Sequence, residues 1–179
     1  MRRSLFTALF LFTVVFALEA QAQAATIILV RHAEKTAIGS DPGLTALGEA
    51  RAHDLASALA DVPLSAVLST QFRRTRLTAE PVAAAAGLET QIIEAAGRMD
   101  ADSKAVADAV NALPRGSTVL IVGHSNTLGP IIAALGGPGI ADLRDDEYST
   151  MFILWRPEGG KIGLVRANYG ARGSLDTEH

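Results

Sequence analysis

Short apolar runs alternate with longer helix-like segments along most of this chain. Thr26–Val30 and Thr118–Val122 are almost continuously apolar and rich in β-branched residues, which is typical of strands buried on both faces of a parallel sheet. Shorter runs of the same kind cover Leu64–Ser69 and Thr90–Ile93. A chain that alternates strands and helices in this way predicts an α/β fold of three layers, α/β/α, with a mostly parallel central sheet.

The segments between these runs carry the signals of helices. Thr45 is a candidate N-cap for a helix whose buried stripe is predicted to hold Leu47, Leu55 and Leu59, with Arg51 on the polar side. Further helices are predicted at 72–86, where Pro81 should kink or divide the helix, from Asp102 or Ser103 to about 113, and from about 127 to 135. A final hairpin is predicted from residues 151–155 and 161–165.

Basic residues follow three of the predicted strands. Arg31 and His32 come directly after the first strand, Arg73 and Arg74 follow the second, and His124 lies just beyond the strand that ends at residue 122. Because the carboxyl ends of parallel strands meet at one edge of a sheet, these side chains are expected to gather in one crevice. The planar donors of arginine match two phosphate oxygens, so such a crevice predicts a phosphate site.

The same residue types suggest how a bound phosphate could react. A neutral histidine can attack phosphorus through a ring nitrogen and form a phosphohistidine, and neighbouring arginines disfavour protonation of that ring. A backbone carbonyl is expected to fix the tautomer, and a carboxylic acid or water to protonate the leaving oxygen. Backbone amides near Ser125 and Asn126, at the start of the helix after His124, are expected to help bind the phosphate.

Four short motifs, in this order, resemble those of the histidine phosphatase superfamily, also called phosphoglycerate mutase-like. Each alone is a weak signal, but four at fitting spacings over residues 26–135 are highly specific. They are Arg31-His32-Ala33-Glu34 for RHGE, Leu44-Thr45-Ala46-Leu47-Gly48 for LTxxG, STQFRRTRLTA (69–79) for S-x-x-x-x-R-[AT]-x-x-T-A, and Gly123-His124-Ser125 for GHG or GHS.

The resemblance implies a phosphoglycerate mutase-like fold and a set of roles. His32 would be the phosphorylated nucleophile and His124 the second histidine of the pocket, while Arg31 and Arg74 would bind the phosphate. Ser125 follows His124 in the matched turn and is taken as a further substrate-binding residue.

The proton donor is less well defined by the motifs. Many members of the superfamily carry a glutamate between the second arginine and the second histidine, and Glu94 is the candidate here. Asp100 and Asp102 lie in the same predicted loop and compete with it, and some short members lack such an acid. Glu34 and Lys35 are expected either to form a surface ion pair or to shape the rim of the pocket.

A short chain without the long insertions of the mutases favours hydrolysis over phosphoryl shuttling. The sequence therefore predicts a phosphatase that needs no cofactor and no metal, since Arg31 and Arg74 would repel a cation. The alternatives are a non-catalytic protein that binds phosphate or a phosphosugar, and a phosphohistidine-protein phosphatase. A lipopolysaccharide-sugar phosphatase also remains open, and the sequence specifies neither the substrate nor the oligomeric state.

The first residues have the pattern of a secretion signal. Met1-Arg2-Arg3 is followed by an apolar run to Leu18 and then by small residues up to Ala25, which predicts a signal peptide at 1–24 and a histidine phosphatase domain at 25–179. The alternative is an uncleaved membrane anchor; after cleavage no stable membrane insertion is expected. This predicts a secreted or periplasmic protein.

The bulk composition limits the partners. The formal net charge of −3, without a basic stripe, argues against nucleic acid as a partner. The chain contains no cysteine, which excludes thiol chemistry and cysteine-ligated zinc. A small phosphorylated substrate is the expected partner.

Overall fold

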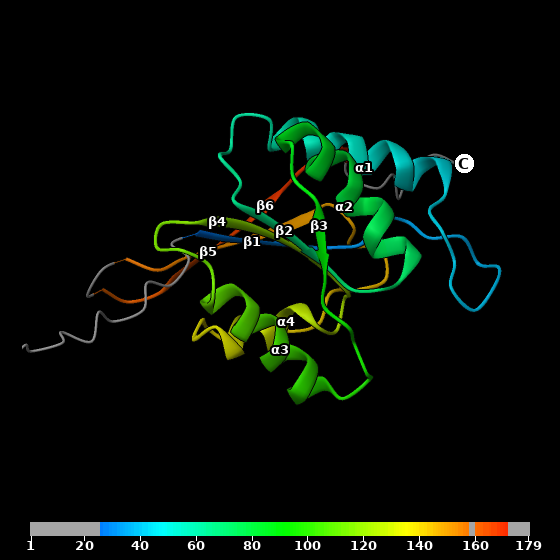
Figure 1. The fold of residues 1–179 in the computed structure, drawn as a ribbon. Helices are drawn as coiled ribbons and strands as arrows, with labels where there is room; N and C mark the ends of the chain where they lie inside the picture. Colours follow the sequence, from blue (N-terminus) through cyan, green and yellow to red (C-terminus); the bar gives the residue numbers. More distant parts are fainter. Residues whose placement is uncertain (1–25, 158–159, 172–179) are drawn as a thin grey trace, which may run out of the picture.

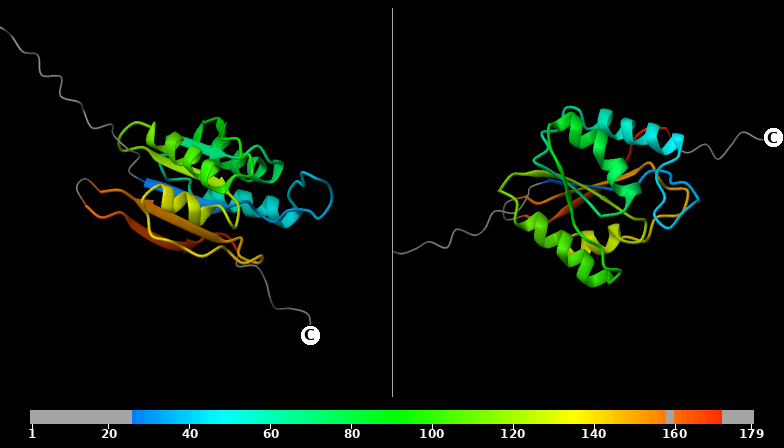
Figure 2. Two further views of the ribbon diagram at one scale, coloured as in Figure 1. Left: turned by 90° about the horizontal axis from the view of Figure 1, so that it is seen from below. Right: turned by 45° about the vertical axis from the view of Figure 1, so that its right-hand side comes forward.

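The computed structural model describes residues 26–157 and 160–171, which form a six-stranded sheet between two layers of helices. Helices α1 and α2 cover one face of the sheet, and α3 and α4 cover the other (Figure 1 and the right-hand view of Figure 2). The predicted three-layer α/β/α fold is confirmed. The elements are β1 (Thr26–Arg31), α1 (Ala46–Ala58), β2 (Ala66–Ser69), α2 (Arg73–Ala86), β3 (Thr90–Ile92), α3 (Met99–Asn111), β4 (Thr118–Gly123), α4 (Leu128–Ala134), β5 (Thr150–Trp155) and β6 (Gly163–Asn168).

The strands lie in the order β3-β2-β4-β1-β5-β6. The first four strands of the chain pair in parallel, whereas β5 and β6 form an antiparallel hairpin that adds to β1. In the central pair, Arg31 at the end of β1 lies opposite Gly123 at the end of β4. The carboxyl ends of β1, β2 and β4 therefore meet at one edge, as the sequence predicted.

Each face of the sheet has its own apolar core, which explains why the central strands are apolar throughout. In β1, Ile27 and Leu29 belong to the cluster with α3 and α4, while Ile28 and Val30 belong to the cluster with α1 and α2. Burying an aliphatic side chain stabilises a fold by about 1.5–3 kcal/mol. The sheet edge that carries the basic residues is thus supported by an apolar core on each face.

Helix α1 buries a different face from the one predicted. Thr45 caps it as expected, with its Oγ1 accepting the Gly48 N–H at 3.1 Å. Gly48, Arg51 and Leu55 face inward, whereas Leu47 is 53% exposed. Positions 48, 51 and 55 share one face at helical spacing, and Leu47 lies about 100° away from Gly48. The placing of Leu47 in the buried stripe and of Arg51 on the polar side was wrong.

Two other helices also differ in detail from the prediction. Helix α2 runs past Pro81 without being divided and ends at Gly87, whose φ of 65° suits glycine. Helix α3 begins at Met99, earlier than expected. Asp102 does not cap this helix; its carboxylate accepts the backbone N–H groups of residues 96–98 and so closes the loop that precedes α3.

The predicted signal peptide at 1–24 lies outside the described residues. None of the helices in residues 26–157 and 160–171 has the length and apolar character needed to cross a bilayer.

Candidate active site

Two histidines meet where β1 and β4 end. His32 is the first residue after β1, and its backbone N–H donates to the carbonyl of Gly123 at 2.9 Å. His124 is the first residue after β4. The continued backbone pairing brings the two rings together, with centroids 5.4 Å apart and planes inclined by 65°. The structure thus brings together the two histidines that the motifs singled out.

Arg31 is fixed by a loop that lies far away in the sequence. Its side chain is buried, and Nη1 donates to the carbonyls of Arg144 at 2.8 Å and Asp145 at 3.1 Å. Its guanidinium lies over the Tyr148 ring, 4.1 Å from the centroid, where the aromatic face attracts a cation. Sequence reasoning missed Tyr148, because the segment before β5 carries no recognisable motif.

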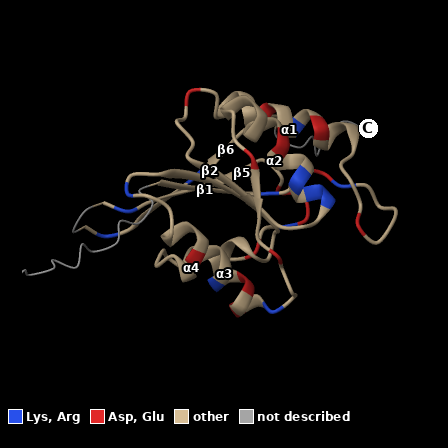
Figure 3. Ribbon diagram, viewed as in Figure 1, with Lys and Arg blue, Asp and Glu red and all other residues tan. Residues whose placement is uncertain are grey.

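Arg74 reaches the same site from the first turn of α2, where basic residues gather (Figure 3). Its guanidinium lies over the Phe72 ring at 4.5 Å, and the Phe72 ring meets His124 edge-on at 5.4 Å. An ion pair of 3.8 Å links Arg74 to Asp41, whose carboxylate also accepts the backbone N–H of Arg73.

The two arginines keep unused donors. The Nε atoms of Arg31 and Arg74 are buried, and within the described part of the chain neither has a hydrogen-bond partner. A buried N–H without an acceptor costs about 1–3 kcal/mol, so an anion that accepted these bonds would stabilise the site. Burial also lowers the pKa of Arg74, against the opposing effect of Asp41.

The backbone fixes the tautomer of His32. Its Nδ1 lies 2.8 Å from the carbonyl of Ala33, and a carbonyl can only accept, so Nδ1 carries the proton and Nε2 of the neutral ring is free. Ala33 is held in turn, because its N–H donates to Thr78 Oγ1 at 2.9 Å. The expected carbonyl acceptor is therefore present.

Both rings are neutral at physiological pH. Burial lowers the pKa of His32 from 6.5 to about 3; the hydrogen bond to Ala33 opposes this, while His124 and the two arginines lower the pKa further. Burial lowers the pKa of His124 to about 4, assisted by Arg74 and then Arg31. The arginines act in the direction expected from the sequence, but burial is the larger cause.

These shifts predict an NMR result. In the free protein we expect neither His32 nor His124 to titrate between pH 5 and 8, because both rings gain a proton only at lower pH. The exposed His53 on α1 serves as a reference resonance from outside the site. Titration of the ring C–H resonances measures this, and a site histidine with a midpoint above 6 would contradict it.

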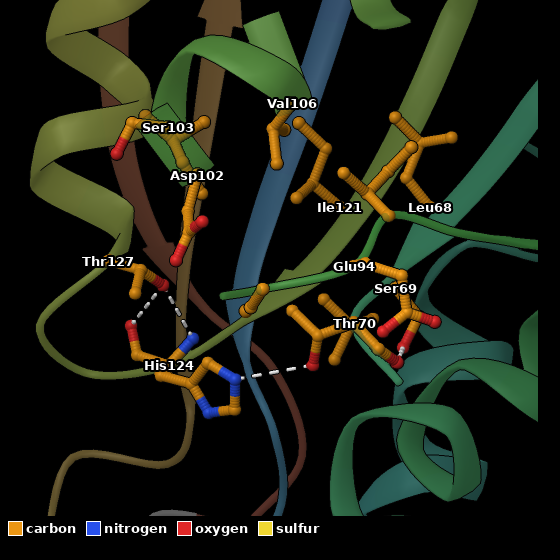
Figure 4. Close-up of a pocket in the computed structure, with 15 residues that line it drawn as sticks. Leu68, Ser69, Thr70, Glu94, Asp102, Ser103, Val106, Ile121, His124 and Thr127 are labelled. Atoms are coloured by element: carbon orange, nitrogen blue, oxygen red, sulfur yellow. Dashed lines mark hydrogen bonds between the residues drawn. The ribbon is translucent and has the colours of Figure 1, made fainter. Parts of the chain in front are cut away.

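The candidate proton donors lie around a small cavity beside His124. The cavity has a volume of about 40 Å³, and Glu94, Asp102 and Thr70 line it together with His124 (Figure 4). Asp102 already accepts the three backbone N–H groups that precede α3. Glu94 is exposed at this point, and Asp100 does not line the cavity. Of the three candidate carboxyl groups, Glu94 is therefore better placed to donate a proton than Asp100 or Asp102.

Ser125 lies in a turn, not in a helix. Helix α4 begins at Leu128, so the amides of Ser125 and Asn126 precede its first turn, contrary to the expectation that they open the helix. The turn is held by Thr127, whose Oγ1 accepts the His124 N–H at 2.9 Å. The Ser125 carbonyl accepts the Leu143 N–H at 3.1 Å. This contact ties the turn to the segment that continues to Tyr148.

Glu34 forms an ion pair with the buried Arg51 that the sequence did not reveal. Its carboxylate accepts Nε and Nη2 of Arg51 at distances of 2.6–2.9 Å. Arg51 is 2% exposed, and its Nη1 donates to the Ala171 carbonyl at 2.9 Å. The expected surface pair of Glu34 with Lys35 is replaced by this contact, because Arg51 faces inward from α1. The alternative role at the rim of the pocket stays a prediction.

The described residues contain no group of three histidine, cysteine, aspartate or glutamate side chains that could hold a metal ion.

Comparison with known families supports the resemblance to the histidine phosphatase superfamily. The model of the histidine phosphatase superfamily, branch 1, matches residues 27–101, a range that includes the first three of the four motifs. A PE-PGRS family protein of Mycobacterium tuberculosis is 31% identical over 112 residues, which make up 62% of this chain and 19% of that protein. The match thus spans about a fifth of this curated relative.

Solved structures of phosphatases share the fold. A protein assigned as an α-ribazole-5′-P phosphatase from Escherichia coli aligns with a TM-score of 0.65 and 20% identity, over 84% of this chain and 98% of that one. The protein histidine phosphatase SixA in complex with tungstate aligns with a TM-score of 0.63 and 19% identity, over 80% of this chain and 96% of that one. A mycobacterial glucosyl-3-phosphoglycerate phosphatase aligns with a TM-score of 0.59 and 17% identity, over 83% of this chain and 100% of that one. At these identities the similarity is one of fold.

Proposed function

We propose that this chain is a member of the histidine phosphatase superfamily, whose family model matches residues 27–101, and that it hydrolyses phosphomonoesters through a phosphohistidine on His32. The observation that carries the proposal is the pair of buried Nε donors on Arg31 and Arg74, which lack partners within the described residues and lie beside two neutral histidines. Unused cationic donors next to an unprotonated ring nitrogen suit a phosphate group and a nucleophile.

The proposed reaction has two steps. The Nε2 lone pair of neutral His32 forms a bond to phosphorus while the ester P–O bond breaks, and the leaving oxygen takes a proton. Water then attacks the phosphohistidine, the P–N bond breaks and the water gives up a proton, which releases phosphate and restores His32. Arg31, Arg74 and His124 stabilise the charge that spreads over the transferring oxygens, and Ser125 is proposed as a further phosphate contact.

Glu94 is our candidate for the proton donor. Its place on the cavity beside His124 supports this role, and water is the alternative source of the proton. We propose that the reaction is independent of metal, since two adjacent arginines disfavour a bound cation. The relatives named as phosphohistidine and phosphosugar phosphatases make both substrate classes candidates here.

A rapid-quench experiment on the purified chain tests the proposal. With a labelled activated aryl phosphate we expect turnover, and a covalent phosphate on the protein that is labile in acid and stable in base, as for phosphohistidine. Vanadate should inhibit, and a chelator should have no effect. Binding of the phosphate without turnover or label would favour the alternative, a non-catalytic phosphate-binding protein. Loss of activity in chelator would instead indicate a metal enzyme.

We also propose that the chain is exported to the periplasm or the medium by the signal peptide at 1–24. The charged start and apolar run of this segment support the proposal. Cell fractionation, followed by N-terminal sequencing of the exported protein, tests both the location and the cleavage site.

A further inference from the structure

A chain of hydroxyl groups connects helix α2 to His124. Thr70 Oγ1 lies 2.7 Å from Thr75 Oγ1 and 3.3 Å from His124 Nε2; Figure 4 shows the contact between Thr70 and the ring. Thr75 Oγ1 in turn lies 2.8 Å from the Phe72 carbonyl and 3.2 Å from the Thr70 carbonyl. Thr75 is buried completely, so its hydroxyl exchanges none of these partners for water.

Counting the protons on these hydroxyl groups fixes the direction of each hydrogen bond. Two oxygens 2.7–2.8 Å apart need a hydrogen between them, and the Phe72 carbonyl has none to give. Thr75 therefore donates its single hydroxyl proton to the Phe72 carbonyl. The short contact between the two hydroxyls must then hold the proton of Thr70. Since Thr70 has no second proton, it can only accept from His124, and Nε2 must be the donor.

We infer that Thr70, oriented by Thr75, is a positioning residue that holds His124 in the Nε2-protonated tautomer. His32 is held in the opposite form, with its proton on Nδ1 facing the Ala33 carbonyl. The two neighbouring rings thus differ in which nitrogen is free. Only Nδ1 of His124 can gain or lose a proton while the contact to Thr70 lasts.

This arrangement gives His124 a defined part in the reaction proposed above. This part of the inference rests on that proposed reaction. When a phosphate raises the local negative charge, His124 can take a proton on Nδ1 and become a donor there, while Nε2–H keeps its bond to Thr70. The charged groups around the ring are Arg74 and Arg31, which oppose protonation, and the Glu94 and Asp102 carboxylates on the shared cavity. A fixed Nε2–H prevents the ring from turning away as its charge changes.

The tautomer can be measured on the wild-type protein without any assay of activity. Long-range ¹H–¹⁵N NMR at pH 7 distinguishes a protonated from an unprotonated ring nitrogen. We expect His124 to show a protonated Nε2 and an unprotonated Nδ1, His32 to show the reverse pattern, and the exposed His53 to show averaged values. A protonated Nδ1 on neutral His124 would overturn the inference, whether or not the chain proves to be a phosphatase.

Variants of Thr70 test the positioning role. Thr70→Val removes the acceptor, so we expect the Nε2 signal of His124 to lose its fixed form and kcat to fall about tenfold, with KM changing less. Thr70→Ser keeps the hydroxyl and should restore both the tautomer and the rate. A wild-type spectrum of His124 in Thr70→Val, or a Thr70→Ser protein as impaired as Thr70→Val, would contradict the role.

Discussion

Replacing His32 with alanine is expected to lower turnover of an aryl phosphate by at least about 10³-fold, because the variant loses the nucleophile itself. The chain has no cysteine to substitute for it. The neighbouring ring of His124 is engaged by Thr70 through Nε2. Steady-state rates at neutral pH, together with the loss of the labelled phosphoenzyme, measure the effect.

Matched variants separate the chemistry from the fold. His53→Ala removes an exposed histidine on α1 and should leave activity unchanged. His32→Asn retains a side-chain N–H that can donate to the Ala33 carbonyl, as Nδ1 does in the wild type. It should therefore fold and bind vanadate, yet remain inactive. Turnover above about a tenth of wild type in a folded His32→Asn protein would exclude His32 as the nucleophile.

The sequence predicted most of the fold because its central strands are apolar on both faces. Val30 and Val122 each precede a basic residue by one or two positions, and parallel pairing then brings Arg31 and His124 to one edge of the sheet. Order and spacing alone carry that information. The cap of α1 at Thr45 and the end of α2 at Gly87 were also local signals, readable from one residue type in one position.

Features that depend on distant contacts were not predictable in this way. Arg51 looks like a surface residue until Glu34, 17 positions earlier, is seen to face it. Tyr148 lies 117 residues from Arg31, and nothing in its surroundings marks it. Asp102 resembles a helix cap, yet its carboxylate turns back to the loop before α3. In each case a polar side chain found its partner through the tertiary fold, and periodicity contains no information about such partners.

Replacing Arg51 with methionine should have the largest effect on stability. We expect the free energy of unfolding to fall by about 3–5 kcal/mol, because the change leaves the half-buried Glu34 carboxylate without its cation. Burial alone would lower the pKa of Arg51, but the hydrogen bonds and charge of Glu34 raise it above its ordinary value, which indicates a strongly coupled pair. Urea denaturation followed by circular dichroism measures the loss.

The design of this experiment depends on two controls. Arg76→Met on the exposed side of α2 makes the same chemical change without a buried partner and should cost less than about 0.5 kcal/mol. Glu34→Gln combined with Arg51→Met removes the isolated charge, so the double variant should be more stable than the single Arg51→Met variant. A double variant that lost the sum of the two single effects would show that the two side chains do not interact.

The same pair is expected to affect the site, because Glu34 lies two residues after His32. Arg51 also binds the Ala171 carbonyl, so one guanidinium joins the loop after β1 to the segment after β6. Gly48 packs so closely on the Glu34 backbone that a β-carbon there would collide with it; the loop is thus held from α1 by two contacts. In folded Arg51→Met protein we expect kcat to fall while phosphate still binds, since Arg31 and Arg74 are fixed by other elements. Equal loss of kcat and of vanadate binding would instead mean that the whole edge of the sheet had moved.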